Sequence, residues 1–399
     1  SLAVKILITT DFYLPHITGV TNVVVNEQRM LSLLGYDVRV LTIFRSTTSS
    51  YKDGVYAMKG SAIQPLRDSQ MTFTYHDPMM KDICSWSPDI IHSNNEFFTM
   101  GYARRLSTKL HIPLIHTCHT DFTRYDAQQR IRHTLWDTMM ARIIKRRLRY
   151  CDLLISPSLS HKQMLMRYKI KQPIRVLPSG IDLERFTTTL SEEKRAALRE
   201  SLGFWPSDFV LVSVCRLASE KRVDQTIDAF FLLSLLEPSA RLLIVGGGPK
   251  EESLRKQVRD LGIESLVVFS GAVPTSEVHT YYHVADLFVS SSVRESQGLG
   301  FVEAMAASLP LLLQEDHSLG LSIEELGIGK LYEDPHSFVT VVSSLIEDPL
   351  KAKEMGANAQ KAGEAFSLDG WAHSLAKILV QCSLDFRNQV HDRGHYNQC

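Results

Sequence analysis

The sequence contains no long apolar run and no cysteine pattern that would mark a secreted or metal-binding protein. None of its apolar segments reaches the roughly 18–20 residues that a membrane-spanning helix requires. The six cysteines are scattered, without a CxxC pair or zinc-ligand spacing, which favours a reduced cytoplasmic chain. The opening residues, SLAVKILITT, predict a strand and lack the architecture of a signal peptide. Any membrane contact is therefore expected to be peripheral.

Net charge is absent as well, because 44 Lys and Arg residues balance 44 Asp and Glu residues. No overall electrostatic field therefore points to nucleic acid. The balance is uneven along the chain, since residues 101–150 contain eleven Lys and Arg but three Asp and Glu. Such an excess can mark a surface that meets anions. The 399 residues, 44% of them hydrophobic, suit two α/β domains with ordinary cores.

Apolar strands alternate with helical patterns in two successive sets, which predicts two Rossmann-like, doubly wound α/β domains. The first set of strands is expected at 4–9, 37–43, 89–92, 113–116 and 153–156. The second set is expected at 208–214, 241–245, 266–270, 287–290 and 309–313. Proline and glycine interrupt the pattern in PSGIDLERF, residues 178–186, where we place the joint. On pattern alone, the terminal helix near 368–383 fits either domain.

Loops that follow strands are the expected ligand sites, because such sheets bind ligands beyond the carboxyl ends of their strands. Arg216 and Lys221 leave one strand end and precede a helix. Two cations beside a helix N-terminus favour a phosphate group. A solvated loop whose charges merely flank a helix explains these residues equally well.

Two carboxylates flank another expected helix start. The segment contains Glu295, Ser296, Gln297, Gly298, Leu299 and Glu303. Glycine lets the backbone approach a ligand closely, and carboxylates can accept paired sugar hydroxyls. The alternative is that Glu303 is only an acidic residue in the first turn of the helix, favoured by the helix dipole.

The strand at 113–116 leads to His116 and His119, whose spacing admits a zinc ion. No matched set of further ligands is evident, so we expect no metal site. Both histidines are otherwise explained as ordinary residues at a strand end.

Gly19 directly precedes a helix expected at 20–34, so the first N–H groups of that helix could face a diphosphate. The chain has no GxGxxG fingerprint, which argues against a dinucleotide enzyme. The glycine run 246–248 is neither that fingerprint nor a P-loop, and a tight turn explains it.

Five cations occur within eight residues of a helix expected at 131–149: Arg142, Lys145, Arg146, Arg147 and Arg149. Apolar residues at helical spacing accompany them, namely Ile131, Leu135, Met139 and Ile143. A basic amphipathic helix of this kind can lie on an anionic membrane surface. The same pattern fits a helix that packs its apolar stripe on the sheet and turns its charges to water.

Taken in order, these segments resemble glycosyltransferase family 4, retaining enzymes of the two-domain glycosyltransferase-B architecture. The matching segments are PHITGV, the His119 loop, PSGIDLERF, CRLASEKRVDQTIDAF, LLIVGGGP and ESQGLGFVEAMAASLP. The resemblance extends over nearly the whole chain and implies two domains facing across a cleft. Residues 1–180 with 370–399 would form the acceptor-side domain, and 181–369 the donor-binding domain.

The resemblance also implies roles in the donor domain. Arg216 and Lys221 match the family's cations on the donor diphosphate, and Glu303 matches the carboxylate that holds the nucleotide ribose. Glu295 matches the acidic residue near the transferred sugar. The backbone from 297 to 299 would contact phosphate and sugar, and Ser296 stands where threonine is common.

In the first domain, Gly19 matches the loop that closes on the diphosphate, and His119 matches the histidine at the reaction centre. The family needs no bound metal, and no Asp-x-Asp motif is evident in a suitable place. The resemblance implies no protein nucleophile, because in this family the leaving phosphate assists attack from the same face of the sugar. Ser308 departs from the pattern, since glycine is common at that position.

The strings SSVRESQGLGFVEAMA and HTCHTDF are similar to segments of bacterial diacylglycerol glucosyltransferases, which are monotopic. This similarity implies UDP-glucose as donor, a lipid acceptor such as 1,2-diacylglycerol, and a place at the inner face of the cell membrane. A soluble sugar or a cell-wall or capsule intermediate is the alternative acceptor. A non-catalytic nucleotide-sugar-binding protein is the alternative class.

Overall fold

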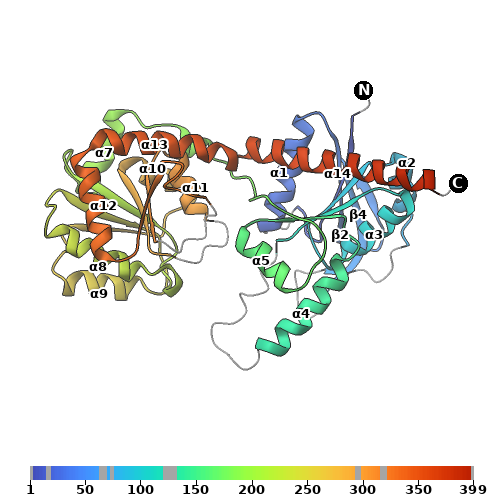
Figure 1. The fold of residues 1–399 in the computed structure, drawn as a ribbon, viewed down its shortest axis with the longest axis horizontal. Coiled ribbons are helices and arrows are strands. Elements are labelled where there is room, and N and C mark those ends of the chain that lie inside the picture. The colour runs from blue at the N-terminus through green and yellow to red at the C-terminus, as the bar shows by residue number, and fades with distance from the viewer. Residues whose placement is uncertain are drawn as a thin grey trace. The chain divides into compact units, whose positions relative to one another are not determined.

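The computed structural model describes residues 3–14, 19–62, 70–71, 76–119, 133–292, 298–314 and 321–396. The chain divides into two compact units (Figure 1). Unit 1 comprises Ser1–Gly180 and Leu368–Cys399, and unit 2 comprises Ile181–Ser367. Each unit is built on one main β-sheet flanked by helices, as expected of doubly wound domains.

Unit 1 contains the sheet β3-β4-β2-β1-β6-β7-β8-β9, and β5 pairs with β4. Its described strands are β1 Lys5–Thr9, β2 Asp37–Arg45, β3 Ser50–Lys52, β4 Val55–Ala62, β5 Gln70–Met71, β6 Ile90–Ser93, β7 Leu114–Thr117, β8 Leu153–Ser156 and β9 Ile174–Val176. Its described helices are α1 Gly19–Leu33, α2 Met79–Trp86, α3 Thr99–Leu110, α4 His133–Leu148, α5 Leu159–Arg167 and α14 Leu368–Tyr396. The strands are parallel except for β3 and β5, which run antiparallel to β4.

Both faces of this sheet are covered, because alternate side chains of a strand point to opposite faces. Ile6 and Ile8 of β1 pack in one apolar cluster with α1 and α14. Leu7 packs in the other cluster, which includes residues of α2, α3, α4 and α5. The near-continuous apolar run of β1 is therefore the sequence signature of a strand buried on both faces.

The terminal helix α14 belongs to unit 1 and packs against its sheet. Its buried residues recur at helical spacing: Trp371, Ala372, Leu375, Ala376 and Leu379. Gly180, at the end of the first segment of the unit, lies so close that a Cβ there would be 2.8 Å from Trp371. This close approach fixes the start of α14 beside the point where the chain leaves unit 1.

Unit 2 has the parallel sheet β12-β11-β10-β13-β14-β15. Its described strands are β10 Phe209–Val214, β11 Ala240–Val245, β12 Val267–Gly271, β13 Leu287–Ser290, β14 Leu311–Gln314 and β15 Gly329–Tyr332. Its described helices are α6 Glu184–Thr187, α7 Glu192–Ser201, α8 Val223–Ser234, α9 Glu251–Asp260, α10 Val278–Val284, α11 Leu299–Ala306, α12 Pro335–Glu347 and α13 Pro349–Gly363, with short 3-10 turns at Ser219–Lys221 and Glu364–Phe366.

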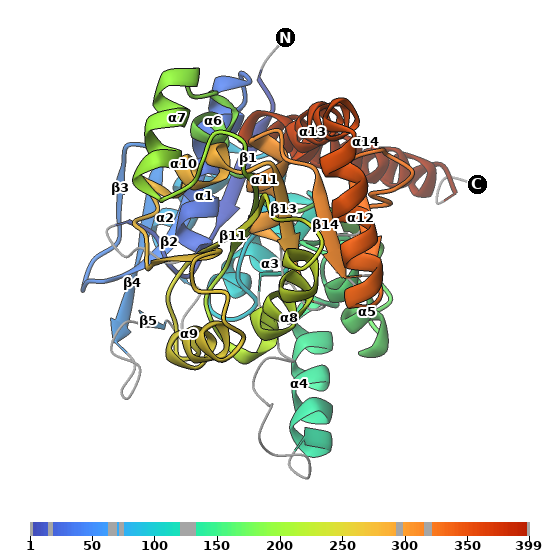
Figure 2. The same ribbon diagram turned by 90° about the vertical axis from the view of Figure 1, so that its left-hand side faces the viewer.

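Helices cover both faces of the unit 2 sheet (Figure 2). Leu211 of β10 belongs to an apolar cluster with residues of α8, α9 and α12. Its neighbours Val210 and Val212 belong to a second cluster with residues of α6, α10 and α11. Numbered along the chain, the strand order is 3-2-1-4-5-6, the order of a Rossmann domain.

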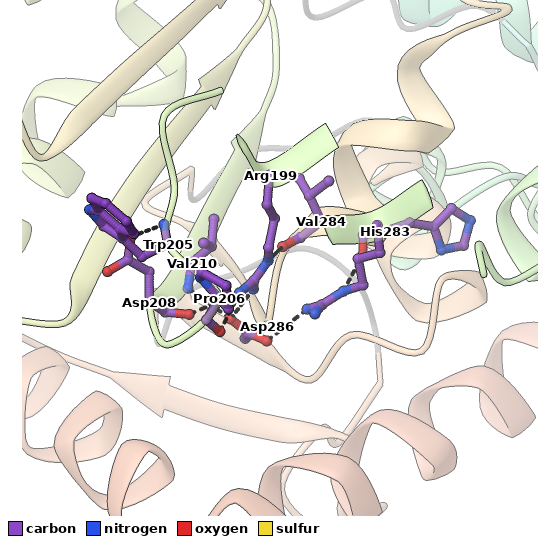
Figure 3. A network of polar contacts seen from close by, with 9 residues as sticks. Arg199, Trp205, Pro206, Asp208, Val210, His283, Val284 and Asp286 are labelled. Atoms are coloured by element: carbon purple, nitrogen blue, oxygen red, sulfur yellow. Dashed lines mark hydrogen bonds and ion pairs between the residues drawn. The ribbon is translucent and has the colours of Figure 1, made fainter. Parts of the chain in front are cut away.

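A polar network ties α7 to the amino ends of β10 and β13 (Figure 3). The buried Arg199 pairs with Asp286 at 2.7 Å and donates to the carbonyl oxygens of Val284 at 2.9 Å and Asp208 at 3.0 Å. Asp286 also accepts from the backbone N–H of Val210 at 2.8 Å. Because Arg199 of α7 contacts the residues just before both strands, and Asp286 bonds Val210 between them, the network aligns the two central strands of the sheet.

Candidate active site

The strand order of unit 2 puts its topological switch point between β10 and β13. In doubly wound sheets, ligands bind beyond the carboxyl ends of the strands at this point. The strand β10 leads to Arg216, which is exposed, and β13 leads toward α11. Two of the segments singled out in the sequence therefore flank the switch point.

Lys221 ends the 3-10 turn Ser219–Lys221, and α8 begins two residues later at Val223. The intervening Arg222 has a left-handed backbone, with φ of 50°, which turns the chain into the helix. The expected position of Lys221 just before a helix N-terminus is confirmed. A phosphate in front of α8 would meet both this ammonium and the free N–H groups of the first turn.

The glycine run after β11 supports the Arg216 loop. A Cβ at Gly246 would lie 2.0 Å from the carbonyl oxygen of Cys215, and one at Gly248 would lie 2.5 Å from that of Leu217. Both glycines also have φ values, 132° and 158°, that side chains disfavour. The run is thus more than the tight turn expected from sequence, because it lets two loops pack backbone to backbone.

The first turn of α11 lies against the end of β10. A Cβ at Gly300 would be 3.1 Å from the carbonyl oxygen of Val214. Gly298 precedes the helix in the left-handed region, with φ of 61°, and Leu299 is 47% exposed. The approach that glycine permits brings α11 beside the loop that carries Arg216.

Glu303 is the fifth residue of α11, so the alternative that it is only a first-turn residue is wrong. The buried Tyr282 donates its hydroxyl to Oε2 of Glu303 at 2.6 Å. Burial raises the pKa of the Glu303 carboxyl, and the hydrogen bond from Tyr282 opposes that rise. The hydroxyl thereby orients the carboxylate and leaves Oε1 as an acceptor for a ligand.

Three of the predicted donor residues lie outside the described residues: Glu295, Ser296 and Gln297. The strand from which their segment departs is firmly anchored. The hydroxyl of Ser291 is 2.6 Å from that of Thr226 on α8 and 2.6 Å from that of Tyr332 on β15. These bonds fix the end of β13 at the switch point.

In unit 1, His119 lies two residues beyond β7, and its Nε2 is 2.7 Å from Oδ1 of Asn94, which directly follows β6. The amide nitrogen of Asn94 donates to Oε2 of Glu27 at 3.3 Å, so its oxygen must accept from His119. The network therefore assigns the proton to Nε2 and leaves Nδ1 as an acceptor. Burial lowers the pKa of His119 to about 3, which keeps the ring neutral at pH 7.

Glu27 of α1 is fully buried and joins this network to the neighbouring strands. Its other carboxylate oxygen bonds Nδ1 of His92, whose Nε2 is 2.7 Å from the hydroxyl of Thr117. Neither Glu27 nor Asn94 was singled out by the sequence. The signal for Asn94 is its place directly after an apolar strand, but nothing local marks Glu27 as its partner.

His116 is a fully buried residue of β7 rather than a strand-end residue. Its Nδ1 is 3.1 Å from the hydroxyl of Ser93, and its Nε2 is 3.5 Å from Oε1 of Glu96. Burial raises the pKa of Glu96, but His116, His119 and the backbone N–H of Glu96 together outweigh it, so the net pKa is lowered. Within the described ranges, no three His, Cys, Asp or Glu side chains are grouped so as to hold a metal ion.

Gly19 is the first residue of α1, one position earlier than expected, and the loop before it, 15–18, lies outside the described residues.

The basic segment falls on the last turns of α4 and the residue after it, and all five of its cations are exposed. The apolar contact with the sheet comes from Ile144 and Leu148, which are fully buried. The prediction that Met139 and Ile143 belong to the buried apolar stripe of this helix was partly wrong, since Met139 is 45% exposed and Ile143 is only half-buried. Among the helices of the described part, none is long and apolar enough to cross a membrane.

Two family models match the chain: Glycosyltransferase Family 4 over residues 17–185, and Glycosyl transferases group 1 over residues 194–362. The mannosylfructose-phosphate synthase of Agrobacterium fabrum is 31% identical over 320 residues, which are 72% of this chain and 67% of the relative. The alpha-monoglucosyldiacylglycerol synthase of Streptococcus pneumoniae is 28% identical over 351 residues, 86% of this chain and 79% of the relative.

Solved structures agree on the fold. The crystal structure of HepE from Anabaena in complex with UDP matches with a TM-score of 0.65 at 17% identity, covering 95% of this chain and 100% of that one. Such a likeness shows the two-domain glycosyltransferase-B fold, while the family models and relatives show the enzyme class. The chain therefore belongs to glycosyltransferase family 4 and is a hexosyltransferase of the glycosyltransferase-B fold.

Proposed function

We propose that this enzyme transfers glucose from UDP-glucose to a lipid acceptor such as 1,2-diacylglycerol at a membrane surface, with retention of anomeric configuration. The observation that carries the proposal is the arrangement at the switch point of unit 2. There, Gly300 lets α11 pack against the end of β10. The oriented carboxylate of Glu303 and the Arg216 loop therefore lie beside the same proposed donor position.

In this proposal the cations bind the donor diphosphate, and Glu303 accepts hydroxyls of the nucleotide ribose. Arg216 supplies a guanidinium that can fork onto phosphate oxygens, and Lys221 adds a charge in front of α8. The open first turn of α11, from Gly298 and Leu299, offers N–H groups to the same diphosphate. Glu295, Ser296 and Gln297 would contact the sugar and phosphate, as the family resemblance implies.

The transfer breaks the bond between C1 of glucose and the diphosphate oxygen and forms a bond between C1 and the acceptor oxygen on the same face. The acceptor proton passes to the leaving diphosphate, so no covalent enzyme intermediate is needed. Charge that develops on the diphosphate is stabilised by Arg216, Lys221 and the helix N-termini. His119, neutral and with Nδ1 unprotonated, would hold a sugar hydroxyl at the reaction centre, and Gly19 at the start of α1 would face the diphosphate.

A lipid acceptor is supported by the similarity to an alpha-monoglucosyldiacylglycerol synthase and by the exposed cations on α4. Arg142, Lys145, Arg146, Arg147 and Arg149 would face the anionic headgroups of the inner leaflet. This surface would bring the enzyme to an acceptor that is confined to the bilayer.

The direct test is incubation of the enzyme with labelled UDP-glucose and diacylglycerol in phosphatidylglycerol vesicles. We expect a labelled glucosyl-diacylglycerol. An α-glucosidase should hydrolyse it, because retention preserves the α-configuration of the donor. A screen of UDP-, GDP- and ADP-sugars that yields no glycolipid with any donor would refute the lipid acceptor.

Donor binding is tested separately with Lys221→Ala and Glu303→Ala, both of which should weaken the binding of UDP. The matched control is Lys256→Ala, because Lys256 is an exposed lysine of the same unit that pairs with Asp260 on α9. An equal loss in the control would mean that charge anywhere on unit 2, rather than the proposed site, sets the affinity.

A soluble sugar or sugar phosphate is the second candidate acceptor, favoured by the similarity to a mannosylfructose-phosphate synthase. Flotation with anionic vesicles separates the two candidates. Binding to vesicles supports the lipid acceptor, and its absence, together with turnover of a soluble sugar, supports the alternative.

We also propose that no metal is required, since the sequence carries no Asp-x-Asp motif in a suitable place. Activity should then persist in EDTA. A loss of activity that magnesium or manganese restores would contradict this part of the proposal.

A further inference from the structure

Unit 1 contains a second place suited to anions, a pocket of about 940 Å³ between α3 and α4. Six cations line it: Arg104, Arg105 and Lys109 from α3, and Arg146, Arg147 and Arg149 from the end of α4 and the residue after it. The cations of α3 are far from the basic segment in the sequence. The fold therefore joins two basic groups that the sequence presents separately.

No acidic residue lines this pocket. Among the described residues, no carboxylate pairs with Arg104, Lys109, Arg146, Arg147 or Arg149. Like charges gathered in one concavity repel one another, and a bound anion would relieve that repulsion. The helix dipole favours the cations in the last turns of α3 and α4, such as Lys109 and Arg146, but it explains neither Arg104 in the middle of α3 nor the convergence of cations from two helices.

Tyr150 holds two of these cations in position. The guanidinium carbon of Arg104 lies 3.5 Å from the centroid of its ring, and that of Arg149 lies 4.5 Å from it. The ring face attracts both cations and so offsets their mutual repulsion. Two guanidinium groups ordered beside one ring are well arranged to share the oxygens of a phosphate group.

The pocket also has an apolar wall formed by Phe97, Met100 and Ile143. Met100 is buried, and the other two are half-buried. A free phosphate ion would use only the cations, whereas a phosphate with a glycerol backbone and the start of an acyl chain would also use this wall. The volume lies in the range of about 300–1,000 Å³ that small-molecule sites occupy.

We propose that this pocket binds the phosphodiester headgroup of an anionic phospholipid. The cations come from the middle and end of α3 and from the end of α4. Asn94 and His119 do not line the pocket, so it is distinct from the place proposed for transfer. The proposal deepens the membrane contact of the proposed function, from a charged surface to one specific site, and it stands even if the acceptor is a soluble sugar.

The pocket predicts specific binding, which differs from attraction of a charged surface to a membrane. Arg142 and Lys145 belong to the same basic segment but do not line the pocket. The pair of substitutions Arg104→Gln and Arg149→Gln removes two charges from the pocket. The pair Arg142→Gln and Lys145→Gln removes two charges from the same unit and leaves the pocket intact.

The experiment titrates full-length enzyme with monomeric dihexanoyl-phosphatidylglycerol, with inorganic phosphate, and with dihexanoyl-phosphatidylcholine, by isothermal calorimetry. Saturable binding of the phosphatidylglycerol is expected, weaker binding of phosphate, and none of the net-neutral lipid. The Arg104/Arg149 pair should weaken the phosphatidylglycerol affinity at least tenfold, and the Arg142/Lys145 pair less than twofold. Unchanged far-UV circular dichroism and thermal unfolding verify that each variant is folded.

Several results would overturn the proposal. Equal losses in the two pairs of variants would mean diffuse electrostatic attraction. Equal affinities for phosphate and phosphatidylglycerol would assign the pocket to free phosphate, and absence of saturable binding would remove the site altogether. Because no glycosyl transfer is measured, failure here would leave the proposed reaction untouched.

Discussion

Replacing Tyr282 by Phe removes the hydroxyl that donates to Oε2 of Glu303 at 2.6 Å and keeps the buried ring. That ring stacks on Phe288 at 6.1 Å between centroids, a contact that phenylalanine preserves. The substitution therefore alters one hydrogen bond to the carboxylate proposed to hold the ribose. It tests the role of Glu303 without removing Glu303.

The size of the effect follows from the bond that is lost. A hydrogen bond to a charged group contributes about 1.5–3 kcal/mol. Because Glu303 is half-buried, water compensates part of this, and the lower end applies. Losing about 1.5 kcal/mol of stabilisation of the ionised carboxylate should raise the pKa of Glu303, already raised by burial, still further.

The sign of the pH dependence is fixed by the charge that binding requires. An ionised carboxylate accepts both ribose hydroxyls, whereas a protonated one must donate from one oxygen. Donor affinity is therefore present above the pKa of Glu303 and falls as the pH drops through it. Tyr282→Phe should move that midpoint to higher pH and leave the affinity on the alkaline plateau nearly unchanged.

The assay is calorimetric titration with UDP-glucose from pH 4.5 to pH 8.5 in the absence of acceptor. UDP-glucose is preferable to UDP because its diphosphate, esterified at both ends, does not titrate in this range. Tyr332→Phe is the matched control, since Tyr332 is a buried tyrosine of the same unit that bonds Ser291 rather than Glu303. Glu303→Gln should abolish the pH step. Superimposable pH profiles for wild type and Tyr282→Phe would refute the reasoning.

The remaining predictions concern turnover and stability. His119→Ala should lower kcat by about two orders of magnitude and change donor affinity far less, since a positioning group acts at the reaction centre; intact turnover would contradict the role given to His119. Arg199→Met should destabilise unit 2 by about 3 kcal/mol in urea unfolding, because it leaves part of a buried ion pair unmatched. Its control Arg195→Met, at a side chain 28% exposed, should cost about 1 kcal/mol, and equal losses would refute the ranking. Ser308→Gly should stabilise the protein by about 1 kcal/mol in thermal melts, because Ser308 has φ of 60°; no gain over Ser308→Ala would contradict this strain.

The strands and the loops that follow them were accessible from the sequence. The segments Phe209–Val214 and Leu287–Ser290 are apolar runs because both faces of their sheet are covered by helices. Since loops at the carboxyl ends of such strands hold ligands, the positions of Arg216 and Lys221 followed from the pattern. Five of the described strands were missed. The strands β3, β5 and β9 have only two or three residues and leave no periodic signal, and β4 and β15 mix lysine and glycine with their apolar residues.

Hydrogen bonds between residues that are far apart in the chain could not be predicted from the sequence. Tyr282 and Glu303 are 21 positions apart, and Glu27 and His92 are 65 apart, so no local pattern links them. Periodicity assigns a residue to a face of its element but does not name what lies opposite. Helix α4 illustrates the limit, because Met139 and Ile143 share one helical row, Ile144 and Leu148 share the adjacent row, and only packing selects the second.

The two units differ at the N-terminus of the helix that follows the strand across the switch point, a position where an anion can bind. In unit 1, α3 follows the strand across the switch point, and Asp11 occupies its N-terminus. Oδ1 of Asp11 accepts from the backbone N–H and the hydroxyl of Thr99, each at 2.7 Å, and Oδ2 accepts from the N–H of Phe98 at 3.3 Å. The chain's own carboxylate thus takes the place of an external anion there.

The counterpart in unit 2 is α11, which begins at Leu299 after Gly298. No side chain among the described residues caps this helix, so its first N–H groups remain available to a ligand. A diphosphate at the start of α3 would have to displace Asp11 and then face its negative charge, whereas at the start of α11 it would meet N–H groups and the nearby Arg216 loop. One carboxylate in unit 1 and two glycines in unit 2 would therefore direct the proposed donor diphosphate to the second of two similar folds.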